Sequence, residues 1–278
     1  MSFPSVPVVL SIAGSDNSAG AGIQADLKTV TTLGCYGLTA VTCVVSEIPG
    51  CVEHIQAIRP SIVASQVALC VKAFPIAAVK IGMLYSTSIM KAVLPVLTDL
   101  LERRGCYLVV DPVMISSSGD PLLQPDAISF YRKHIFPLAR VITPNLDELS
   151  HLCKRKITSL SEMKKAGLEL TERHGCAVLC KGGHLKKNAG IDLLVDGDII
   201  TSYEGIYRKN VSTHGSGCTY SSAIAAGLAK GKNLPDAVFE AKNYIQAAID
   251  QTLHWGSTQA LQHVPVRTSK KSKTPPAA

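Results

Sequence analysis

Short apolar runs that are typical of buried strands alternate with helical stretches along most of this 278-residue chain. The first run, Val8-Val9-Leu10-Ser11-Ile12, is followed by a glycine-rich turn and then by a helical stretch that ends at Gly34, where a C-cap glycine is expected. Further strands are predicted at 37–45, 77–82, 107–111, 138–145 and 177–181, a hairpin at 191–200, and helices at 21–33, 61–73, 87–103, 125–134, 160–173, 219–230 and 235–252. Because continuous apolar strands are buried on both faces, the pattern predicts a mostly parallel sheet covered by helices on both sides.

Residues 1–263 contain no internal repeat and no low-complexity linker, so we expect a single α/β domain there. Residues 264–278 are rich in lysine and proline and are predicted to form a basic, disordered tail. That tail carries part of the formal net charge of +7. The remaining excess fits anionic small substrates, and since no nucleic-acid-binding motif accompanies it, we expect no nucleic-acid partner.

The nine cysteines are scattered, and no C-x-x-C pair occurs among them. This usage is typical of reduced, buried thiols and argues against a zinc site. The N-terminal Met1-Ser2-Phe3-Pro4 lacks the pattern of a signal peptide, and no apolar run is long enough to span a membrane. We therefore expect a cytoplasmic protein with no membrane association.

Polar residues and glycines follow each of the predicted parallel strands. In sheets of this type ligands bind at the carboxyl ends of the strands. Each position also has an ordinary structural interpretation, because Asn145, for example, is a suitable N-cap for the helix after it. Their recurrence at six strand ends favours a binding site made of the loop from Gly14 to Gly22, Glu47, Gly82-Met83, Asp111, Asn145 with Glu148, and Lys181-Gly182-Gly183-His184.

The run Thr213-His214-Gly215-Ser216-Gly217-Cys218-Thr219 leads directly into a helical stretch of small residues. A Gly-x-Gly turn at a helix N-terminus leaves backbone N–H groups unpaired, and the helix dipole adds positive charge there. Such a turn suits an anion such as a phosphate, although capping the helix is an equally ordinary role for it.

These groups together are suited to phosphoryl transfer, which needs positive charge around the phosphoryl group, metal-binding carboxylates and a route for the acceptor proton. Asp111, Asn145 and Glu148 are candidates for holding Mg²⁺ directly or through water, and Lys181 for contacting a phosphate. The sequence has no P-loop motif. A dinucleotide-dependent dehydrogenase fits less well, because Gly20-Ala21-Gly22 lacks the third glycine of that fingerprint.

Several blocks resemble the hydroxymethylpyrimidine/phosphomethylpyrimidine kinases of thiamin synthesis, within the ribokinase-like superfamily. The resemblance runs from about residue 8 to 263. It is carried by Ala13-Gly14-Ser15-Asp16, Gly20-Ala21-Gly22-Ile23-Gln24-Ala25-Asp26-Leu27-Lys28, Lys80-Ile81-Gly82-Met83-Leu84, Asp111-Pro112-Val113-Met114, Ser118-Gly119-Asp120-Pro121-Leu122-Leu123, Thr143-Pro144-Asn145-Leu146-Asp147-Glu148, Lys181-Gly182-Gly183-His184 and the 213–219 run.

This resemblance implies a three-layer α/β/α sandwich and an ATP- and Mg²⁺-dependent phosphotransferase. The acceptor would be the hydroxymethyl group of 4-amino-5-hydroxymethyl-2-methylpyrimidine and its monophosphate, and the protein would be a homodimer. Cys218 matches the position of the catalytic base in such enzymes. The other matches are Gly215, Ser216, Gly217 and Lys181 in catalysis, Thr213, Gly215, Gly217 and Lys181 at ATP phosphates, Gly14, Asp26, Glu47 and Met83 at the substrate, and Asp111, Asn145 and Glu148 at the metal.

Glu47 departs from the family pattern, which has a glutamine at the aminopyrimidine edge. A carboxylate offers only hydrogen-bond acceptors unless it is protonated. The related kinases of pyridoxal and other B6 vitamers are therefore the principal alternative, since their substrates also carry a hydroxymethyl group on a nitrogen heteroaromatic ring. A non-catalytic ligand-binding protein on the same scaffold is a further alternative, weakened by the presence of Cys218, Asn145 and Glu148.

Overall fold

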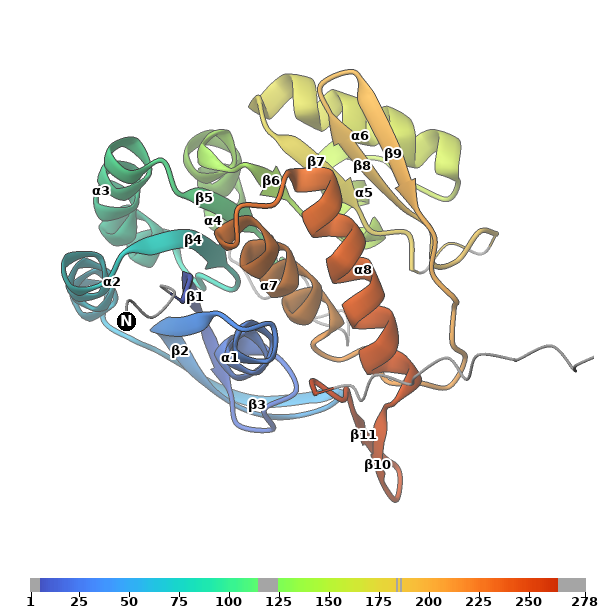
Figure 1. The fold of residues 1–278 in the computed structure, drawn as a ribbon, viewed down its shortest axis with the longest axis horizontal. Helices are drawn as coiled ribbons and strands as arrows, with labels where there is room; N and C mark the ends of the chain where they lie inside the picture. The colour runs from blue at the N-terminus through green and yellow to red at the C-terminus, as the bar shows by residue number, and fades with distance from the viewer. Residues whose placement is uncertain (1–5, 115–124, 184, 186, 265–278) are drawn as a thin grey trace, which may run out of the picture.

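The computed structural model describes residues 6–114, 125–183, 185 and 187–264. Within them, nine strands form one sheet in the order β3-β2-β1-β4-β5-β6-β7-β8-β9 (Figure 1). The central strands are parallel: β1 (Val8–Asp16), β2 (Tyr36–Ile48), β4 (Ile76–Ile81), β5 (Tyr107–Val110), β6 (Val141–Ile142) and β7 (Ala177–Cys180). The mostly parallel sheet predicted from the alternation of strands and helices is confirmed.

Antiparallel strands lie at both edges of this sheet. At one edge β3 (Cys51–Ala57) pairs with β2, and at the other β8 (Asp192–Asp196) and β9 (Ile199–Tyr203) follow β7. The β8–β9 hairpin was predicted, and Gly197 in its turn has the positive φ of +60° that favours glycine. β3 was not predicted, because an edge strand that is largely exposed needs no apolar run.

Helices cover both faces of the sheet and complete a three-layer sandwich (Figure 1). Alternate residues of β1 point to opposite faces, so Leu10 and Ile12 belong to one apolar core and Val9 to the other. The helices on the Val9 side are α1 (Gly22–Thr32), α7 (Ser216–Ala229) and α8 (Leu234–Asp250). Those on the other side are α2 (Pro60–Ala73), α3 (Thr87–Arg104), α4 (Pro125–Phe130), α5 (Leu146–Cys153) and α6 (Leu160–His174).

Some elements differ from the sequence-based expectations. The strand expected at 138–145 is reduced to β6, and the helix expected at 125–134 changes after α4 into a π-helical turn, η1 (Tyr131–Ile135), and a 3-10 turn, η2 (Phe136–Leu138). A two-stranded hairpin, β10 (Leu253–Trp255) with β11 (Thr258–Ala260), follows α8. Nearly all of the predicted tail and the 118–123 block lie outside the described residues. Among the described helices, none has the length and apolar character needed to cross a membrane.

Candidate active site

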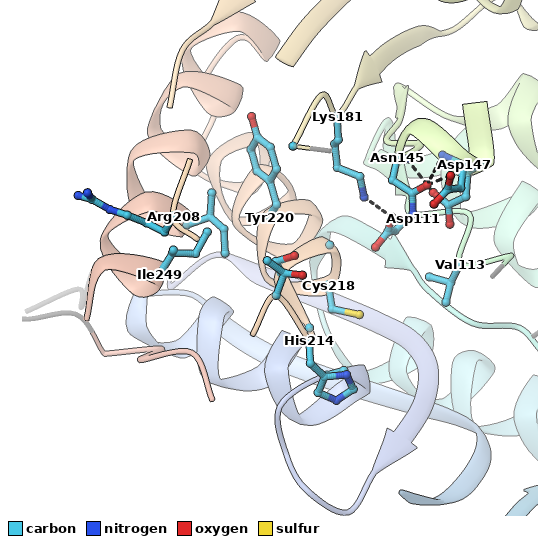
Figure 2. Close-up of a pocket in the computed structure, with 18 of the residues that line it drawn as sticks. Asp111, Val113, Asn145, Asp147, Lys181, Arg208, His214, Cys218, Tyr220 and Ile249 are labelled. Atoms are coloured by element: carbon cyan, nitrogen blue, oxygen red, sulfur yellow. Dashed lines mark hydrogen bonds and ion pairs between the residues drawn. The ribbon is translucent and has the colours of Figure 1, made fainter. Parts of the chain in front are cut away.

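A cavity of about 600 Å³ lies at the carboxyl ends of the parallel strands, and its size is typical of a small-molecule site. Loops after three neighbouring strands and the turn before α7 line its centre, while α8 lines one end (Figure 2). The cavity brings together most of the predicted site residues. Those that line it are Glu47, Asp111, Asn145, Glu148, Lys181, Thr213, Gly215, Ser216, Gly217 and Cys218.

An ion pair between Asp111 and Lys181 lies in the middle of the cavity. Lys181 Nζ donates to Asp111 Oδ1 at 3.0 Å, and the Thr143 hydroxyl donates to the same oxygen at 3.2 Å. Asp111 follows β5 and Lys181 follows β7, the two strands on either side of β6, and a parallel bridge between Asn145 and Lys181 extends the pairing of β6 with β7. Burial alone lowers the pKa of Lys181, but the carboxylates of Asp111 and Glu148 raise it above its usual value. The lysine is therefore a cation at neutral pH.

Asn145 and Glu148 form a capping box at the start of α5. Asn145 Oδ1 accepts hydrogen bonds from the backbone amides of Asp147 and Glu148 at 2.9 Å, and Glu148 Oε2 accepts from the Asn145 amide at 2.8 Å. The capping role considered for Asn145 from the sequence is thus present. Burial raises the pKa of Glu148, and the neighbouring Asp111 raises it further, while Lys181 lowers it.

The buried carboxylates make this region suitable for a cation. Asp111 and Glu148 supply the oxygen ligands that Mg²⁺ prefers, and a divalent ion between them would relieve the cost of burying two negative groups. Asn145 Oδ1 and both Glu148 oxygens already accept backbone hydrogen bonds, and Met114 donates the one to Glu148 Oε1 at 3.2 Å. The donor set fits a hydrated Mg²⁺ that Asn145 and Glu148 contact through its water molecules.

The glycine turn (residues 213–218) begins α7 with Gly215 as N-cap, at a positive φ of +76°. A Cβ on Gly215 would lie 1.8 Å from the carbonyl oxygen of Gly20, so the turn packs against the glycine loop after β1 too closely for any other residue. The amides of Gly217 and Cys218 belong to the first turn of α7, where N–H groups have no acceptor within the helix. They and the positive end of the helix dipole suit an anion in the cavity.

Cys218 lines the cavity next to this turn. Burial raises the pKa of its thiol to about 11, with Asp26 and Asp111 raising it and Lys80 and the Gly22 amide lowering it. In the free protein the sulfur therefore carries a proton at neutral pH. A reaction that uses it as a base must add positive charge nearby or couple its deprotonation to the transfer.

Three of the four predicted substrate-binding residues lie outside the described cavity lining. Asp26 is fully buried, and both of its oxygens accept from Lys80 Nζ, at 2.8 and 2.9 Å. A Cβ on Gly14 would lie 2.8 Å from Met83 Cε, so these two residues contact each other behind the cavity wall. Glu47 alone of the four lines the described cavity. The substrate contacts of Gly14, Asp26 and Met83 stay predictions.

Sequence reasoning assigned no role to Asp16 or His214, which join the two glycine-rich segments. His214 Nε2 lies 3.0 Å from Asp16 Oδ2, and the Ala21 amide donates to the same oxygen at 2.7 Å. A Cβ on Gly20 would lie 2.8 Å from the His214 ring, which explains the glycine there. Both residues stand inside the glycine-rich blocks, which could have marked them as candidate site residues. The sequence contains no signal that the two side chains contact each other, because they are far apart along the chain.

Apolar side chains also line the cavity. Ile206 and Tyr207 come from the segment after β9, and Ile245 and Ile249 from α8. Figure 2 shows Ile249 and Arg208 on the side of Tyr220 that is away from Asp111. Sequence reasoning did not single out these residues, because isolated apolar positions in a loop and a helix carry no motif. A flat aromatic group such as a nucleobase fits such a surface.

Solved structures share this fold over almost the whole chain. The pyridoxal kinase of Bacillus subtilis is 32% identical, with a TM-score of 0.85. The superposition covers 94% of this chain and 98% of that one. The phosphomethylpyrimidine kinase of Clostridium difficile is 39% identical, with a TM-score of 0.76, and covers 87% of this chain and 99% of that one. By its fold the protein is a kinase of the ribokinase-like class.

Its sequence defines the family within that class. The family model described as phosphomethylpyrimidine kinase matches residues 16–264, and the chain belongs to this family. The hydroxymethylpyrimidine/phosphomethylpyrimidine kinase of Rhizobium meliloti is 42% identical over 243 residues, which are 87% of this chain and 90% of that protein. A longer relative from Schizosaccharomyces pombe is 39% identical. The match covers 50% of that protein, so the chain spans about half of its length.

Proposed function

We propose that the protein transfers the γ-phosphoryl group of ATP to 4-amino-5-hydroxymethyl-2-methylpyrimidine at its hydroxymethyl oxygen, and to the resulting monophosphate. The observation that carries the proposal is the Lys181–Asp111 pair next to the glycine turn, in a chain of this family. A lysine cation, a helix N-terminus and a thiol converge on one cavity, as phosphoryl transfer to an alcohol requires.

In this proposal Lys181 and the amides of Gly217 and Cys218 hold the γ-phosphate, with Thr213, Gly215 and Ser216 shaping the turn. Positive groups already in place stabilise the charge that spreads over the phosphoryl oxygens during transfer. The adenine base occupies the part of the cavity lined by Ile249 and Arg208 (Figure 2).

We further propose that Asp111, Asn145 and Glu148 hold Mg²⁺, the last two through its water molecules. When bound, Mg²⁺ neutralises charge on the β- and γ-phosphates. The residues that would hold the ion are fixed at the carboxyl ends of β5 and β6, since Asp111 is 3% exposed and Glu148 is fixed by the capping box. Titration calorimetry with MgATP, compared with ATP in EDTA, tests this site, and Glu148→Gln should weaken the Mg²⁺ dependence.

Cys218 is proposed to receive or polarise the proton of the acceptor hydroxyl. The proposal is supported by its position at the end of the glycine turn, where it lines the cavity together with the residues proposed to hold the γ-phosphate. Because general-base contributions are about 10²- to 10⁴-fold, Cys218→Ala should lower kcat by about 10²-fold or more, and Cys218→Asp should retain more activity than the alanine variant. A Cys218→Ala enzyme within about threefold of wild type would remove the thiol from the mechanism.

Pyridoxal is the second candidate acceptor. It is favoured by the higher TM-score of 0.85 to the pyridoxal kinase of Bacillus subtilis, against 0.76 for the phosphomethylpyrimidine kinase of Clostridium difficile. The deciding experiment is a side-by-side kinase assay on the hydroxymethylpyrimidine, its monophosphate and pyridoxal. We expect the pyrimidine to have the highest kcat/KM, and a preference for pyridoxal would replace our proposal. Phosphorylation of none of the three would favour a ligand-binding protein.

We also propose that residues 1–263 act as one kinase domain in the cytoplasm, as a homodimer. All nine cysteines are free, which suits a reducing compartment. The exposed apolar side chains of Val44 and Ile48 on β2 are candidates for the contact between subunits. Light scattering of wild type and Ile48→Glu tests the dimer, which should be lost or weakened in the variant.

A further inference from the structure

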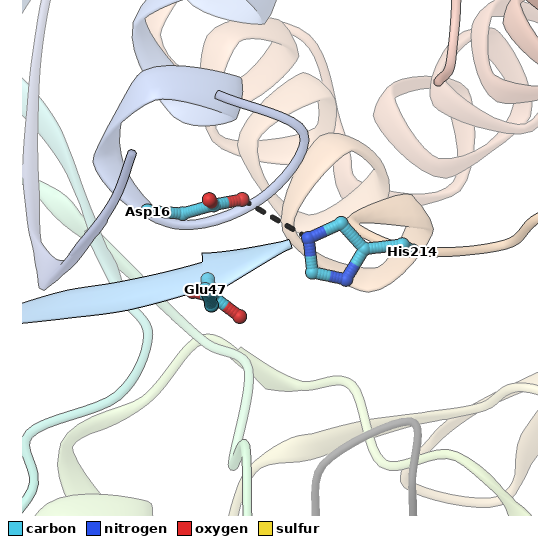
Figure 3. A group of neighbouring side chains, drawn as sticks. All are labelled: Asp16, Glu47 and His214. Carbon is cyan, nitrogen blue, oxygen red and sulfur yellow. Dashed lines mark hydrogen bonds and ion pairs between the residues drawn. The ribbon is translucent and has the colours of Figure 1, made fainter. Parts of the chain in front are cut away.

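Three titratable side chains from distant parts of the chain meet at one wall of the cavity (Figure 3). Asp16 ends β1, Glu47 lies near the end of β2, and His214 precedes α7, and one polar atom of each lies within 4.8 Å of the others. Asp16 is buried, whereas Glu47 and His214 line the cavity together with Cys218. The cluster therefore borders the same cavity as the thiol proposed to act on the acceptor hydroxyl.

Hydrogen bonds fix the charge of the Asp16–His214 pair. Burial by itself raises the pKa of Asp16, but hydrogen bonds from His214, Ser18 and Ala21 outweigh it and lower that pKa to about 2. The hydrogen bond to Asp16 raises the pKa of His214, against the smaller effect of burial. The hydrogen bond between them thus favours a carboxylate on Asp16 and the protonated form of the His214 imidazole.

Glu47 supplies a second carboxylate. Burial and Asp16 raise its pKa, and His214 lowers it. Among the described residues, the Cys43 thiol lies on the same strand as Glu47, and Val52 on β3 is paired with Glu47. Glu47 thus adds a second carboxyl group beside the Asp16–His214 pair.

The hydrogen bonding of the cluster leaves Glu47 as the group that faces the acceptor. The oxygens of Asp16 already accept from two backbone amides and the imidazole, at 2.6, 2.7 and 3.0 Å. Glu47 is held through its backbone amide, which donates to Asn17 Oδ1 at 2.6 Å, while its carboxylate accepts no hydrogen bond from the described residues. A carboxylate has two acceptor oxygens and no donor, and the group that matches it has two adjacent N–H donors.

We propose that Glu47, flanked by the Asp16–His214 pair, binds the acceptor as a protonated amino-heteroaromatic ring. Such a ring carries an amino group beside a protonated ring nitrogen, and its two N–H groups meet the two Glu47 oxygens as arginine meets a carboxylate. The neutral ring takes one proton from water on binding, and that proton lies between the ring nitrogen and a Glu47 oxygen. This inference rests on the proposed function and assigns the selection of the acceptor to Glu47.

A neutral aminopyrimidine fits this wall less well than its protonated form. Its unprotonated ring nitrogen is an acceptor that would face a Glu47 oxygen without a hydrogen between them, which is unfavourable in a half-buried site. A glutamine offers one donor and one acceptor and matches the neutral ring directly. Glu47→Gln should therefore change the proton balance of binding and leave the shape of the site unchanged.

The test is titration calorimetry of 4-amino-5-hydroxymethyl-2-methylpyrimidine into the protein at pH 8, in two buffers of different ionisation enthalpy. The difference in heat between buffers counts the protons taken up. We expect uptake of about one proton in wild type and none in Glu47→Gln. The matched control, Glu53→Gln on the exposed strand β3, should behave as wild type.

Two results overturn the inference: binding by wild type without proton uptake, and equal uptake in wild type and Glu47→Gln, which would assign the proton to His214 or another group. Absence of binding also overturns it. The analogue without the amino group should bind wild type at least about tenfold more weakly. Proton uptake without phosphorylation after addition of MgATP would contradict the proposed function alone, whereas phosphorylation without proton uptake would contradict this inference alone.

Discussion

Nζ of Lys181 lies 3.0 Å from Oδ1 of Asp111, directly beside the backbone of Gly217. A Cβ on Gly217 would lie 3.2 Å from that nitrogen and 3.1 Å from Asp111 Oδ2. A side chain at position 217 would therefore be crowded by both members of the ion pair. The glycine leaves the lysine and the backbone amides at the start of α7 open to the cavity, as the proposed phosphate site requires.

Gly217→Ala should impair catalysis while leaving the fold intact. The added methyl group would contact both members of the ion pair, at distances tighter than ordinary van der Waals contact. We expect kcat/KM for ATP to fall by about 10²-fold, because small displacements of catalytic groups have effects of that order. Steady-state kinetics and the melting temperature together check this.

Gly183→Ala is the matched control, since a Cβ there meets nothing within 4 Å. Although Gly183 also lines the cavity, its variant should lower kcat/KM by far less than Gly217→Ala does, because the added methyl group meets no neighbour. Equal activity of the Gly217→Ala and Gly183→Ala proteins would mean that the space around Gly217 is not used by the phosphate.

The second prediction concerns the protonation of Cys218. Burial raises the pKa of this thiol to about 11. Since only the thiolate reacts with iodoacetamide, the alkylation rate of Cys218 in the free protein should rise about tenfold per pH unit from pH 8 to 10 without levelling. Mass spectrometry of the Cys218 peptide, in a Cys51→Ser background that removes the exposed thiol, measures the rate.

A rate that levels near pH 8 would show that the positive groups around Cys218 outweigh its burial. Adding Mg²⁺ and a non-hydrolysable ATP analogue separates the effect of the bound nucleotide from that of the protein. Protection from alkylation in that complex would further place the thiol at the phosphate.

It could be predicted that Asp111, Asn145 and Lys181 lie at one edge of the sheet, because this follows from chain direction alone. Each residue comes just after a buried apolar strand, and parallel strands bring their carboxyl ends to one edge. The edge strand β3 could not be predicted in this way, since Cys51–Ala57 is mostly exposed and carries no apolar run. β6 is shorter than predicted because only Val141 and Ile142 pair with both neighbours.

The sequence does not predict which side chains of the site pair with each other when they are far apart along the chain. Asp26 looks like a polar residue on a helix that faces a ligand, but its partner is Lys80 on β4, to which both oxygens are bound. Only the packing of α1 against the sheet makes that pairing visible. His214 is likewise recognisable as part of a glycine turn, whereas its partner Asp16 lies 198 residues away along the chain.

The third prediction concerns the buried ion pair of Lys80 and Asp26. The side chains of Lys80 and Asp26 are 0% exposed, and breaking a pair of this kind by removing one partner costs about 3–5 kcal/mol. Lys80→Met should therefore destabilise the protein by about that amount, because it leaves Asp26 buried without its counter-ion. Guanidinium unfolding measures the change.

The double variant Lys80→Met/Asp26→Asn should recover at least about half of the loss, since it removes the unpaired charge and keeps an acceptor for Ser222. Lys232→Met, which breaks a pair at the surface, is the control and should cost less than about 1 kcal/mol. A double variant no more stable than Lys80→Met would mean that lost packing, and not the uncompensated charge, causes the effect.

The last prediction is a loss of stability in mild acid that originates at His174. This side chain is 7% exposed, and its ring packs edge-on against Phe136 with the ring centroids 5.2 Å apart. Burial, with Arg132 and Arg173 nearby, lowers its pKa from about 6.5 to about 4. Between these values the unfolded chain binds a proton that the folded protein does not, so stability must fall as the pH falls through this window.

We expect His174 to contribute roughly 2 kcal/mol to the stability lost between pH 6.5 and pH 4. His174→Leu removes the titrating group while keeping an apolar side chain against Phe136, and the variant should lose less stability than wild type over the same range. His54→Gln on the exposed strand β3 should leave the wild-type slope unchanged. Guanidinium unfolding at pH 7.5, 6 and 5 measures all three proteins, and parallel slopes for wild type and His174→Leu would exclude His174 as the source.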